Sequence, residues 1–298
     1  MQIVVVDSSR VVLQIIASLI EPRGHDVHAF TDSAQALDFL AATPAVRVLI
    51  TSLEVRPLSG LELCWSARLL AEARGPLHVI TMSSARNVRS LAEALDSGAD
   101  DFIEKPPSAE ELNARLRAAE RLTTMQEELI RLAETDPLTG SYNRRAFFNR
   151  ARSAAEQGRR LGAVSAILID IDHFKRINDA HGHDVGDVAI RAVAELISGA
   201  GIAGRLGGEE FALVLPGCGL ALAVARAESL RAGVQALEIP GSSGPIQLSC
   251  SFGVSTWADG DSIETLIKRA DIALYAAKSG GRNRVVPEQD HAARAVAG

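Results

Sequence analysis

Residues 205–216 read RLGGEEFALVLP, in which two glycines and two adjacent glutamates precede an apolar run. Glycines allow a tight hairpin and let the backbone approach a ligand closely. The run EEFALVLP predicts a strand that leaves this hairpin. Because neighbouring carboxylates repel each other, Glu209 and Glu210 predict a cation at the mouth of the strand.

A second acidic strand is predicted at residues 163–171, AVSAILIDI, and continues as DHFKRINDAHGHDVGD. Side chains alternate along a strand, so Asp170 and Asp172 share one face while Ile171 points to the other. A carboxylate in an apolar strand carries a desolvation cost unless a positive group meets it. For one such acid alone, a structural ion pair is the simpler interpretation.

Taken together, the two acidic strands favour magnesium bound with a nucleoside triphosphate. Magnesium is usually held by one or two carboxylates plus substrate phosphates, and two such ions support in-line displacement at phosphorus. The histidines at 173, 181 and 183 leave zinc as an alternative, although no cysteine joins them. The glycines of GAGIAG at 199–204 match a dinucleotide motif, but a helix precedes them and a strand follows, the reverse of the required order.

The two halves of the chain differ in pattern. In the first half, QIVVV, VHAF, VRVLIT and LHVIT predict strands separated by helices, which indicates βαβ units and a parallel sheet. In the second half, strands at 163–171, 209–216 and 246–257 alternate with helices around 185–197, 220–237 and 262–280. With 298 residues the chain is long enough for two domains, an α/β domain followed by a mixed one.

A long helix is predicted between the halves. Ser108 and Glu111 form a capping box after two prolines, and the turn sequence DPLTG follows the helix. Its apolar residues recur every three or four positions, namely Leu112, Leu116, Ala119, Leu122, Met125, Leu129 and Leu132. Two interpretations stay open: the stripe packs on its own domain, or it pairs with a second copy of the chain.

Composition limits the class of protein. The net charge of −6 and the 4% aromatic content argue against a nucleic-acid partner. No window approaches about 18 uninterrupted apolar residues, so we expect no membrane insertion. The three cysteines lie far apart without metal-ligand spacing, which indicates a reduced, cytoplasmic chain.

Four ordered motifs resemble the GGDEF domain of diguanylate cyclases: DPLTGSYNRR at 136–145, DIDHFKRINDAHGHDVGD at 170–187, RLGGEEF at 205–211 and ADIALYAAKSGGRN at 270–283. The resemblance implies a palm-like α+β domain with a βαββαβ core at 135–286. It also implies that each domain binds one GTP, and that two facing domains condense their GTP molecules into cyclic di-GMP plus two pyrophosphates.

The resemblance further implies roles for single residues. Asp170, the carbonyl of Ile171, Glu209 and Glu210 would hold two magnesium ions, with manganese as a substitute. Glu209 would also be the base for the 3′-hydroxyl, and Lys175 would stabilise charge on the reacting phosphate.

The substrate would be held by further residues. Asn178 and Asp187 would read the guanine edge, Phe174 and His183 would line the substrate site, and Lys278 and Arg282 would grip the phosphates. Asp187 can accept from guanine N1–H and N2–H₂, a match that adenine lacks, so we expect GTP rather than ATP. Lys278 and Arg282 are four residues apart at a helix end, where a solvated basic pair that complements the helix dipole is the alternative.

One family feature is missing. Many relatives have an R-x-x-D motif that binds product and inhibits the enzyme. The corresponding positions here run from Ser198 to Gly201 and hold neither residue. We therefore expect no product-inhibition site there.

Residues 1–122 resemble a receiver domain of two-component signalling, a flavodoxin-like (βα)5 fold, through IVVVDSS, SGLEL, VITMSS and GADDFIEKPP. Ser52 stands where the phosphoacceptor aspartate is expected. The acidic pair is reduced to Asp7, although Lys105 and Ser83 are kept. We therefore expect a pseudo-receiver that acts through dimer geometry or a regulatory protein partner.

The expected organisation is a receiver-like domain at 1–122, a linker helix and coiled coil at 123–134, the GGDEF domain at 135–286 and a disordered tail at 287–298. The expected assembly is a homodimer through the linker helix and the receiver. The alternative function is a non-catalytic interaction protein that responds to GTP or cyclic di-GMP, which the intact acidic motifs oppose.

Overall fold

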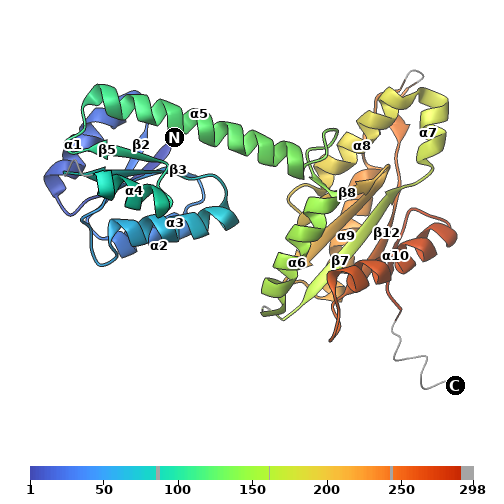
Figure 1. Ribbon diagram of the computed structural model, residues 1–298. Helices are drawn as coiled ribbons and strands as arrows, with labels where there is room; N and C mark the ends of the chain where they lie inside the picture. The colour runs from blue at the N-terminus through green and yellow to red at the C-terminus, as the bar shows by residue number, and fades with distance from the viewer. Residues whose placement is uncertain (85–87, 161, 242–243, 290–298) are drawn as a thin grey trace. The chain divides into compact units, whose positions relative to one another are not determined.

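The computed structural model describes residues 1–84, 88–160, 162–241 and 244–289 (Figure 1). The chain divides into two compact units, and the division falls between Arg131 and Leu132. The domain limits predicted at 122 and 135 bracket this point.

The first unit is a parallel sheet with helices on both faces. Its strands are β1 (Gln2–Val6), β2 (Asp26–Phe30), β3 (Val46–Ser52), β4 (His78–Ser83) and β5 (Asp101–Glu104). They pair in the order β2-β1-β3-β4-β5. This is the flavodoxin-like order, and it confirms the predicted fold.

Helices cover both faces because alternate strand residues are apolar on each side. On one face, Ile3, Val48 and Ile80 pack against α1 (Arg10–Ile20) and the start of α5 (Ala109–Glu134). The other face packs on α2 (Ser33–Ala42), α3 (Gly60–Arg74) and α4 (Val88–Asp96). A single 3-10 turn, η1 (Glu21–Arg23), follows α1.

The apolar stripe of α5 changes its environment along the helix. Ser108 Oγ accepts a hydrogen bond from the backbone N–H of Glu111 (3.1 Å), which caps the helix as predicted. The first three apolar residues of the stripe, Leu112, Leu116 and Ala119, are buried in the first unit. The next four are exposed: Leu122 (49%), Met125 (61%), Leu129 (60%) and Leu132 (61%). Packing within the unit therefore accounts for only the first half of the stripe.

The second unit is built on a mixed sheet in the order β13-β12-β7-β9-β8-β6. The strands are β6 (Tyr142–Asn143), β7 (Val164–Ile171), β8 (Ile202–Gly207), β9 (Glu210–Pro216), β12 (Cys250–Thr256) and β13 (Val285–Pro287). The helices are α6 (Arg144–Arg160), α7 (Phe174–His181), α8 (His183–Ile197), α9 (Leu220–Gln235) and α10 (Ile263–Ser279). Its four central strands are antiparallel neighbours, and their order along the chain with α7, α8 and α9 is the predicted βαββαβ core.

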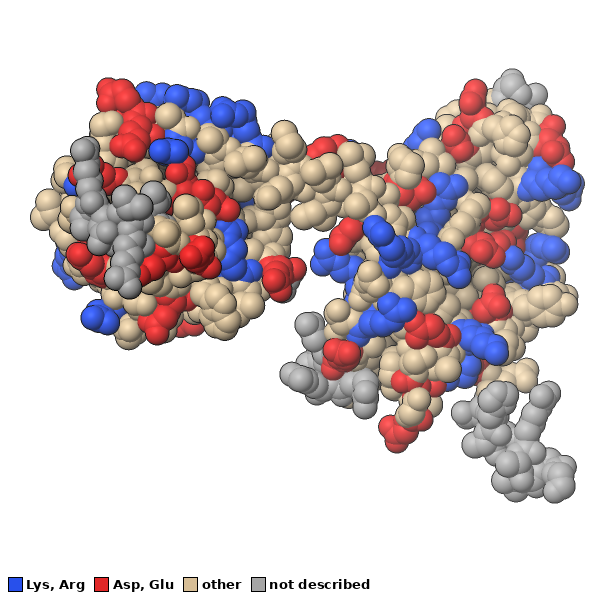
Figure 2. Space-filling model, viewed as in Figure 1, with Lys and Arg blue, Asp and Glu red and all other residues tan. Residues whose placement is uncertain are grey.

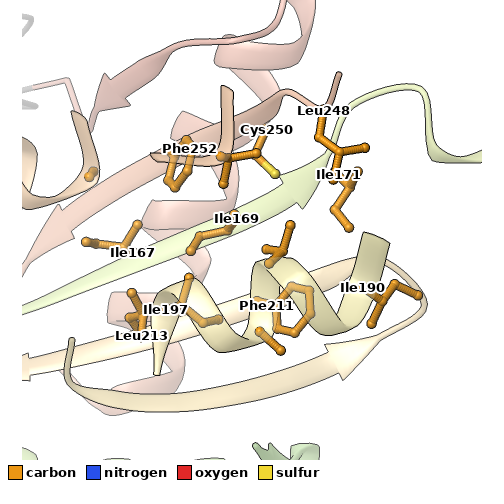
Figure 3. Close-up of a cluster of buried hydrophobic side chains, with 14 of the residues drawn as sticks. Ile167, Ile169, Ile171, Ile190, Ile197, Phe211, Leu213, Leu248, Cys250 and Phe252 are labelled. Carbon is orange, nitrogen blue, oxygen red and sulfur yellow. The ribbon is translucent and has the colours of Figure 1, made fainter. Parts of the chain in front are cut away.

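The two faces of this sheet have different partners. Ile167, Ile169 and Ile171 of β7 point into a core that Phe211 of β9 and helices α8 and α9 complete (Figure 3). The alternate residues of the same strand, such as Leu168, face α6 and α10. Because side chains alternate, Asp170 belongs to the α6 and α10 face.

Two predictions near the C-terminus need correction. The continuous strand expected at 246–257 is interrupted: β11 (Ile246–Gln247) pairs with β10 (Glu238–Ile239), and β12 starts only at Cys250. The interruption falls at residues 248 and 249, where the carbonyl of Ser249 still accepts from the N–H of Asp172 (2.9 Å) and Ser249 Oγ donates to Asp172 Oδ2 (2.7 Å). The first residues of the tail expected from residue 287 are held in the fold, because Pro287 ends β13 and Glu288 binds Arg269 (2.5 Å). Residues 290–298 of that predicted tail lie outside the described residues.

Two further features are the distribution of charge on the surface and the length and polarity of the helices. On the face shown in Figure 2, acidic and basic side chains are interspersed over both units. Within the described residues, every helix is too short or too polar to cross a membrane.

Candidate active site

The acidic residues of two neighbouring strands meet at one edge of the second unit. Asp170 of β7 stands directly opposite Glu210 of β9 in the antiparallel register. Residues in such a pair have their side chains on the same face, with Cβ atoms about 5 Å apart. Glu209 lies one residue before β9, and its carbonyl accepts from the N–H of Ile171 (3.4 Å). The structure thus brings Asp170, Ile171, Glu209 and Glu210 together.

The hairpin that carries these glutamates is held by an arginine. Gly208 and Glu209 form the two-residue turn between β8 and β9, and Gly208 has a φ of 44°, which tight hairpins require. Arg205 Nε and Nη2 donate to the carbonyl of Gly208 (2.9 and 2.7 Å), and Arg205 Nη1 lies 2.9 Å from Asp136 Oδ1. Although burial opposes it, hydrogen bonds from Arg205 and Thr139 hold the pKa of Asp136 below its ordinary value.

Arg205 was not among the predicted site residues. The sequence indicated a role for Arg205 only through its position at the start of the RLGGEEF motif. Its partner Asp136 lies 69 residues away, and no spacing rule connects the two.

Asp170 is buried and already paired with a cation. Its side chain is 10% exposed, and Lys278 Nζ of α10 lies 2.6 Å from Asp170 Oδ2. Burial raises the pKa of Asp170 to about 6; Lys278 opposes this rise, whereas Glu209 and Glu210 add to it. The structural ion pair considered for this acid is therefore present, and its partner is a residue predicted to grip phosphates.

The donor set of this edge fits a hard cation held jointly with a substrate. Carboxylate oxygens from two strands converge on one face, where Asp170 is largely removed from water. In the described part of the chain, no three acidic, histidine or cysteine side chains form a ready-made metal cage. An ion that completes its shell with phosphate oxygens needs no such cage. The zinc alternative at His173, His181 and His183 likewise finds no assembled ligand set among these residues.

A second part of the site lies on α7 and α8, beyond the end of β7. Gly186 of α8 is buried, and a Cβ atom there would stand 1.9 Å from Asn178 Oδ1 and 3.1 Å from Phe174 Cζ. Asn178 therefore packs on α8 at Gly186, the residue before Asp187. Asn178 Oδ1 is buried without a hydrogen-bond partner among the described residues. An unpaired buried oxygen is costly, and this one faces the backbone of α8 at Gly186.

Sequence reasoning had no role for Gly186. The absence of a side chain at this position makes room for Asn178, and a glycine inside an amphipathic helix is the signal that was available.

The other predicted residues differ in their exposure. Lys175 lies exposed in the first turn of α7, His183 is the exposed first residue of α8, and Phe174 packs against the core. The placement of Arg282 needs correction: α10 ends at Ser279, so Arg282 lies in the following loop and not one helical turn after Lys278. Glycines at 280 and 281 stop the helix before the spacing of four can apply.

At the position of the missing inhibitory motif, the backbone also leaves no room for a side chain at residue 201. Ser198 caps the end of α8, and a Cβ atom at Gly201 would stand 2.7 Å from the carbonyl oxygen of Val214. Both residues line a cavity of about 650 Å³ that also includes Arg191 and Glu195. An aspartate at position 201 would collide with β9.

In the first unit, the side chains around the expected phosphoacceptor position bind one another. Ser52 is the last residue of β3 and is fully buried. Its hydroxyl accepts from the N–H of Glu54 (3.0 Å) and from the Lys105 ammonium. Lys105 Nζ also lies 2.6 Å from Asp7 Oδ2, and Asp7 is 1% exposed. One acid and one lysine thus neutralise each other beside a serine.

Comparisons with known proteins agree with this architecture. Residues 133–284 match the family model described as diguanylate cyclase, GGDEF domain, and residues 3–117 match the response regulator receiver domain. The response regulator PleD of Caulobacter vibrioides is 35% identical over 83% of this chain and 58% of its own length. The diguanylate cyclase VdcA of Vibrio cholerae is 42% identical over 59% of this chain and 54% of its own length. The chain thus spans little more than half of these relatives.

Solved structures resemble the second half of the chain. The coiled coil and GGDEF domain of DgcB from Caulobacter crescentus, in complex with c-di-GMP, has a TM-score of 0.53 and 35% identity over 59% of this chain and 98% of its own. The diguanylate cyclase SiaD of Pseudomonas aeruginosa, in complex with its activator SiaC, has a TM-score of 0.50 and 34% identity over 59% of this chain and 71% of its own.

Proposed function

The chain belongs to the diguanylate cyclase GGDEF-domain family and carries a receiver domain before it, and on that premise we propose that it condenses two GTP molecules into cyclic di-GMP. In each half-reaction a 3′-oxygen forms a bond to the α-phosphorus of the other GTP, and the bond to pyrophosphate breaks. The observation that carries the proposal is the convergence of Asp170 with Glu209 and Glu210 from the adjacent strand. Such a site suits a reaction that depends on positioning and charge neutralisation.

Asp170, Glu209, Glu210 and the carbonyl of Ile171 are the residues that would hold magnesium, or manganese in its place. Bound there, the ions would neutralise the triphosphate and polarise the reacting phosphate. Glu209 takes the proton from the attacking 3′-hydroxyl, because it sits on the exposed hairpin turn where a second substrate can approach. Lys175 and Lys278 supply positive charge to the phosphates, and Lys278 already stands 2.6 Å from Asp170.

Guanine recognition is assigned to α7 and α8. Asn178 contacts the guanine edge, and Asp187 accepts from guanine N1–H and N2–H₂. Phe174 and His183 line the same region. Adenine presents an acceptor where guanine presents N1–H, so a site of this kind discriminates against ATP by leaving its own groups unpaired.

Dimerisation is part of the proposal, because each site holds one GTP and the product joins two. The exposed residues Leu122, Met125, Leu129 and Leu132 are spaced by three, four and three, the pattern of a coiled-coil seam. We assign this segment to pairing with a second copy of the chain.

The receiver is assigned a role that does not depend on phosphorylation. Ser52 is buried and its hydroxyl is engaged by Lys105 and Glu54, and Asp7 stands alone where two acids would be needed for a metal. The receiver would act through the geometry of the dimer or through a bound protein. SiaD, a related cyclase, is known in complex with an activator protein.

A product assay tests the function. The purified chain is incubated with magnesium and either GTP or ATP, and the products are separated by chromatography. We expect cyclic di-GMP and pyrophosphate from GTP only, loss of product in Asp170→Asn, and full product in Asp259→Asn, an exposed loop acid in the same unit. Binding of GTP without any product would instead support the non-catalytic interaction protein and refute the cyclase.

A further inference from the structure

The loop after α10 has an unusual backbone conformation. Gly281 has a φ of 111°, and the next two residues, Arg282 and Asn283, have φ values of 61° and 44°. Two consecutive non-glycine residues in the left-handed region are unfavourable and persist only when surrounding contacts fix them. This loop carries the arginine that is assigned to the phosphates.

A buried carboxylate supplies one of those contacts. Asp172 follows β7 and is 5% exposed. Its Oδ2 accepts from the backbone N–H of Asn283 (3.0 Å) and from Ser249 Oγ (2.7 Å), and its Oδ1 accepts from Ser251 Oγ (2.7 Å). All three donors are neutral. Both oxygens are thus occupied by the protein itself, which separates Asp172 from the acids assigned to metal.

Asp172 directly follows β7, close to the acidic edge of the site. Asp170 and Asp172 lie two residues apart and share a face. Asp170 binds Lys278 in the last turn of α10, and Asp172 binds the loop that follows. The end of one strand therefore fixes both segments that carry the basic residues assigned to the phosphates.

Further contacts of the loop agree with this arrangement. Arg231 Nη1 of α9 donates to Asn283 Oδ1 (3.0 Å), and the N–H of Arg282 donates to the carbonyl of Ala277 (3.0 Å). These bonds orient the backbone of the loop, whereas the Arg282 side chain itself is exposed and open to a ligand.

We infer that Asp172 is a positioning residue, which with Ser249 and Ser251 holds the loop at 280–284 so that Arg282 faces the triphosphate. The inference rests on the proposed assignment of Arg282 to the phosphates. It adds a residue that touches neither metal nor substrate and yet sets the affinity for the phosphates.

The test is a double-mutant cycle on the full chain. Binding of α,β-methylene GTP with magnesium is measured for the parent, Asp172→Asn, Arg282→Ala and the double variant. We expect each single variant to weaken binding about tenfold, the loss expected for one charge-assisted hydrogen bond. We expect the double variant to be no weaker than Arg282→Ala alone, because Asp172 acts through Arg282. Affinity for guanosine, which has no phosphate, should not change.

Controls separate this role from simple stabilisation. Asp261 lies at the other end of α10, where Arg269 and the N–H of Ala258 (2.7 Å) bind its carboxylate. Asp261→Asn should lower the melting temperature without changing nucleotide affinity. Ser249→Ala, which removes one donor from Asp172, gives a milder variant if Asp172→Asn fails to fold, and it should weaken the analogue two- to threefold or so by the same reasoning. In both Asp172→Asn and Ser249→Ala, the magnesium concentration that gives half-maximal binding of the analogue should be unchanged.

The outcomes are distinguishable. If Asp172→Asn and Arg282→Ala weaken binding additively, or if Asp172→Asn behaves like Asp261→Asn, the positioning role is refuted while the proposed function stands. A shifted magnesium requirement would make Asp172 a metal ligand and would also refute the inference. If Arg282→Ala leaves analogue binding unchanged, both this inference and the assigned phosphate contact fail.

Discussion

Replacement of Gly186 by alanine separates recognition from stability in one experiment. The new Cβ atom would stand 1.9 Å from Asn178 Oδ1 and 3.1 Å from Phe174 Cζ. The amide is at the end of a short side chain, so it can rotate away, but it then leaves the position from which we propose that Asn178 contacts guanine. We expect little loss of folding stability, because Gly186 lies within α8 and alanine is favoured over glycine in a helix by roughly 1 kcal/mol.

The expected magnitude follows from the lost hydrogen bond. A net loss of about 1–1.5 kcal/mol corresponds to a five- to tenfold or so rise in KM for GTP. Because guanine is bound equally in the ground and transition states, kcat should hardly change. The melting temperature should stay equal to that of the parent or rise slightly.

Steady-state kinetics and thermal melts on the same preparation check both effects. Gly233→Ala in α9 is the matched control, since the nearest atoms to its Cβ atom would be Leu196 methyl groups at 3.1 Å, at the opposite end of α8 from Gly186. Stability can change in this control, but KM should not. An unchanged KM in Gly186→Ala, or a KM rise that follows a drop in melting temperature, would refute the reasoning.

Three further predictions concern charge, assembly and phosphorylation. Burial raises the pKa of Asp170 to about 6, so the folded state loses stability as the pH rises from about 4 to 6 and this group ionises. In thermal melts without nucleotide, Asp170→Asn should be more stable than the parent at pH 7.5 and equal to it near pH 4. A stability difference that does not change with pH would contradict this. Leu122→Glu with Leu129→Glu places charges on the exposed half of α5, and sedimentation should show a monomer with at least tenfold lower activity per chain, whereas a fully active monomer would exclude the helix as the dimer contact. Acetyl phosphate with magnesium should leave the mass of the chain unchanged, and a stoichiometric phosphoryl group on Ser52 or its neighbours would contradict the pseudo-receiver.

Much of the second unit could be predicted because its pattern is local. Alternation along 163–171 placed Asp170 and Asp172 on one face, and the contacts of both with α10 and its following loop confirm this. The helix at 262–280 was equally clear, since Ser262 caps it and glycines end it. Such features depend on neighbours within a few residues.

The features that were missed depend on distant partners. Ser249 and Ser251 bind Asp172 across 77 and 79 residues, and the strand that periodicity predicted is divided because β11 pairs with β10. The short helix α7 was not predicted, because its eight residues are too few for a clear apolar period. Arg282 was placed on a helix by its spacing from Lys278, but the glycines between them direct the chain into a loop.

The most direct test of the account is a crystal structure of the chain with α,β-methylene GTP and manganese, with anomalous diffraction used to locate the ions. We expect manganese bound to Asp170 and Glu209 and to phosphate oxygens, with Lys278 turned from Asp170 toward the triphosphate. An occupied nucleotide site in which no manganese contacts either carboxylate would contradict the central claim that acids of two neighbouring strands bind the triphosphate through divalent ions.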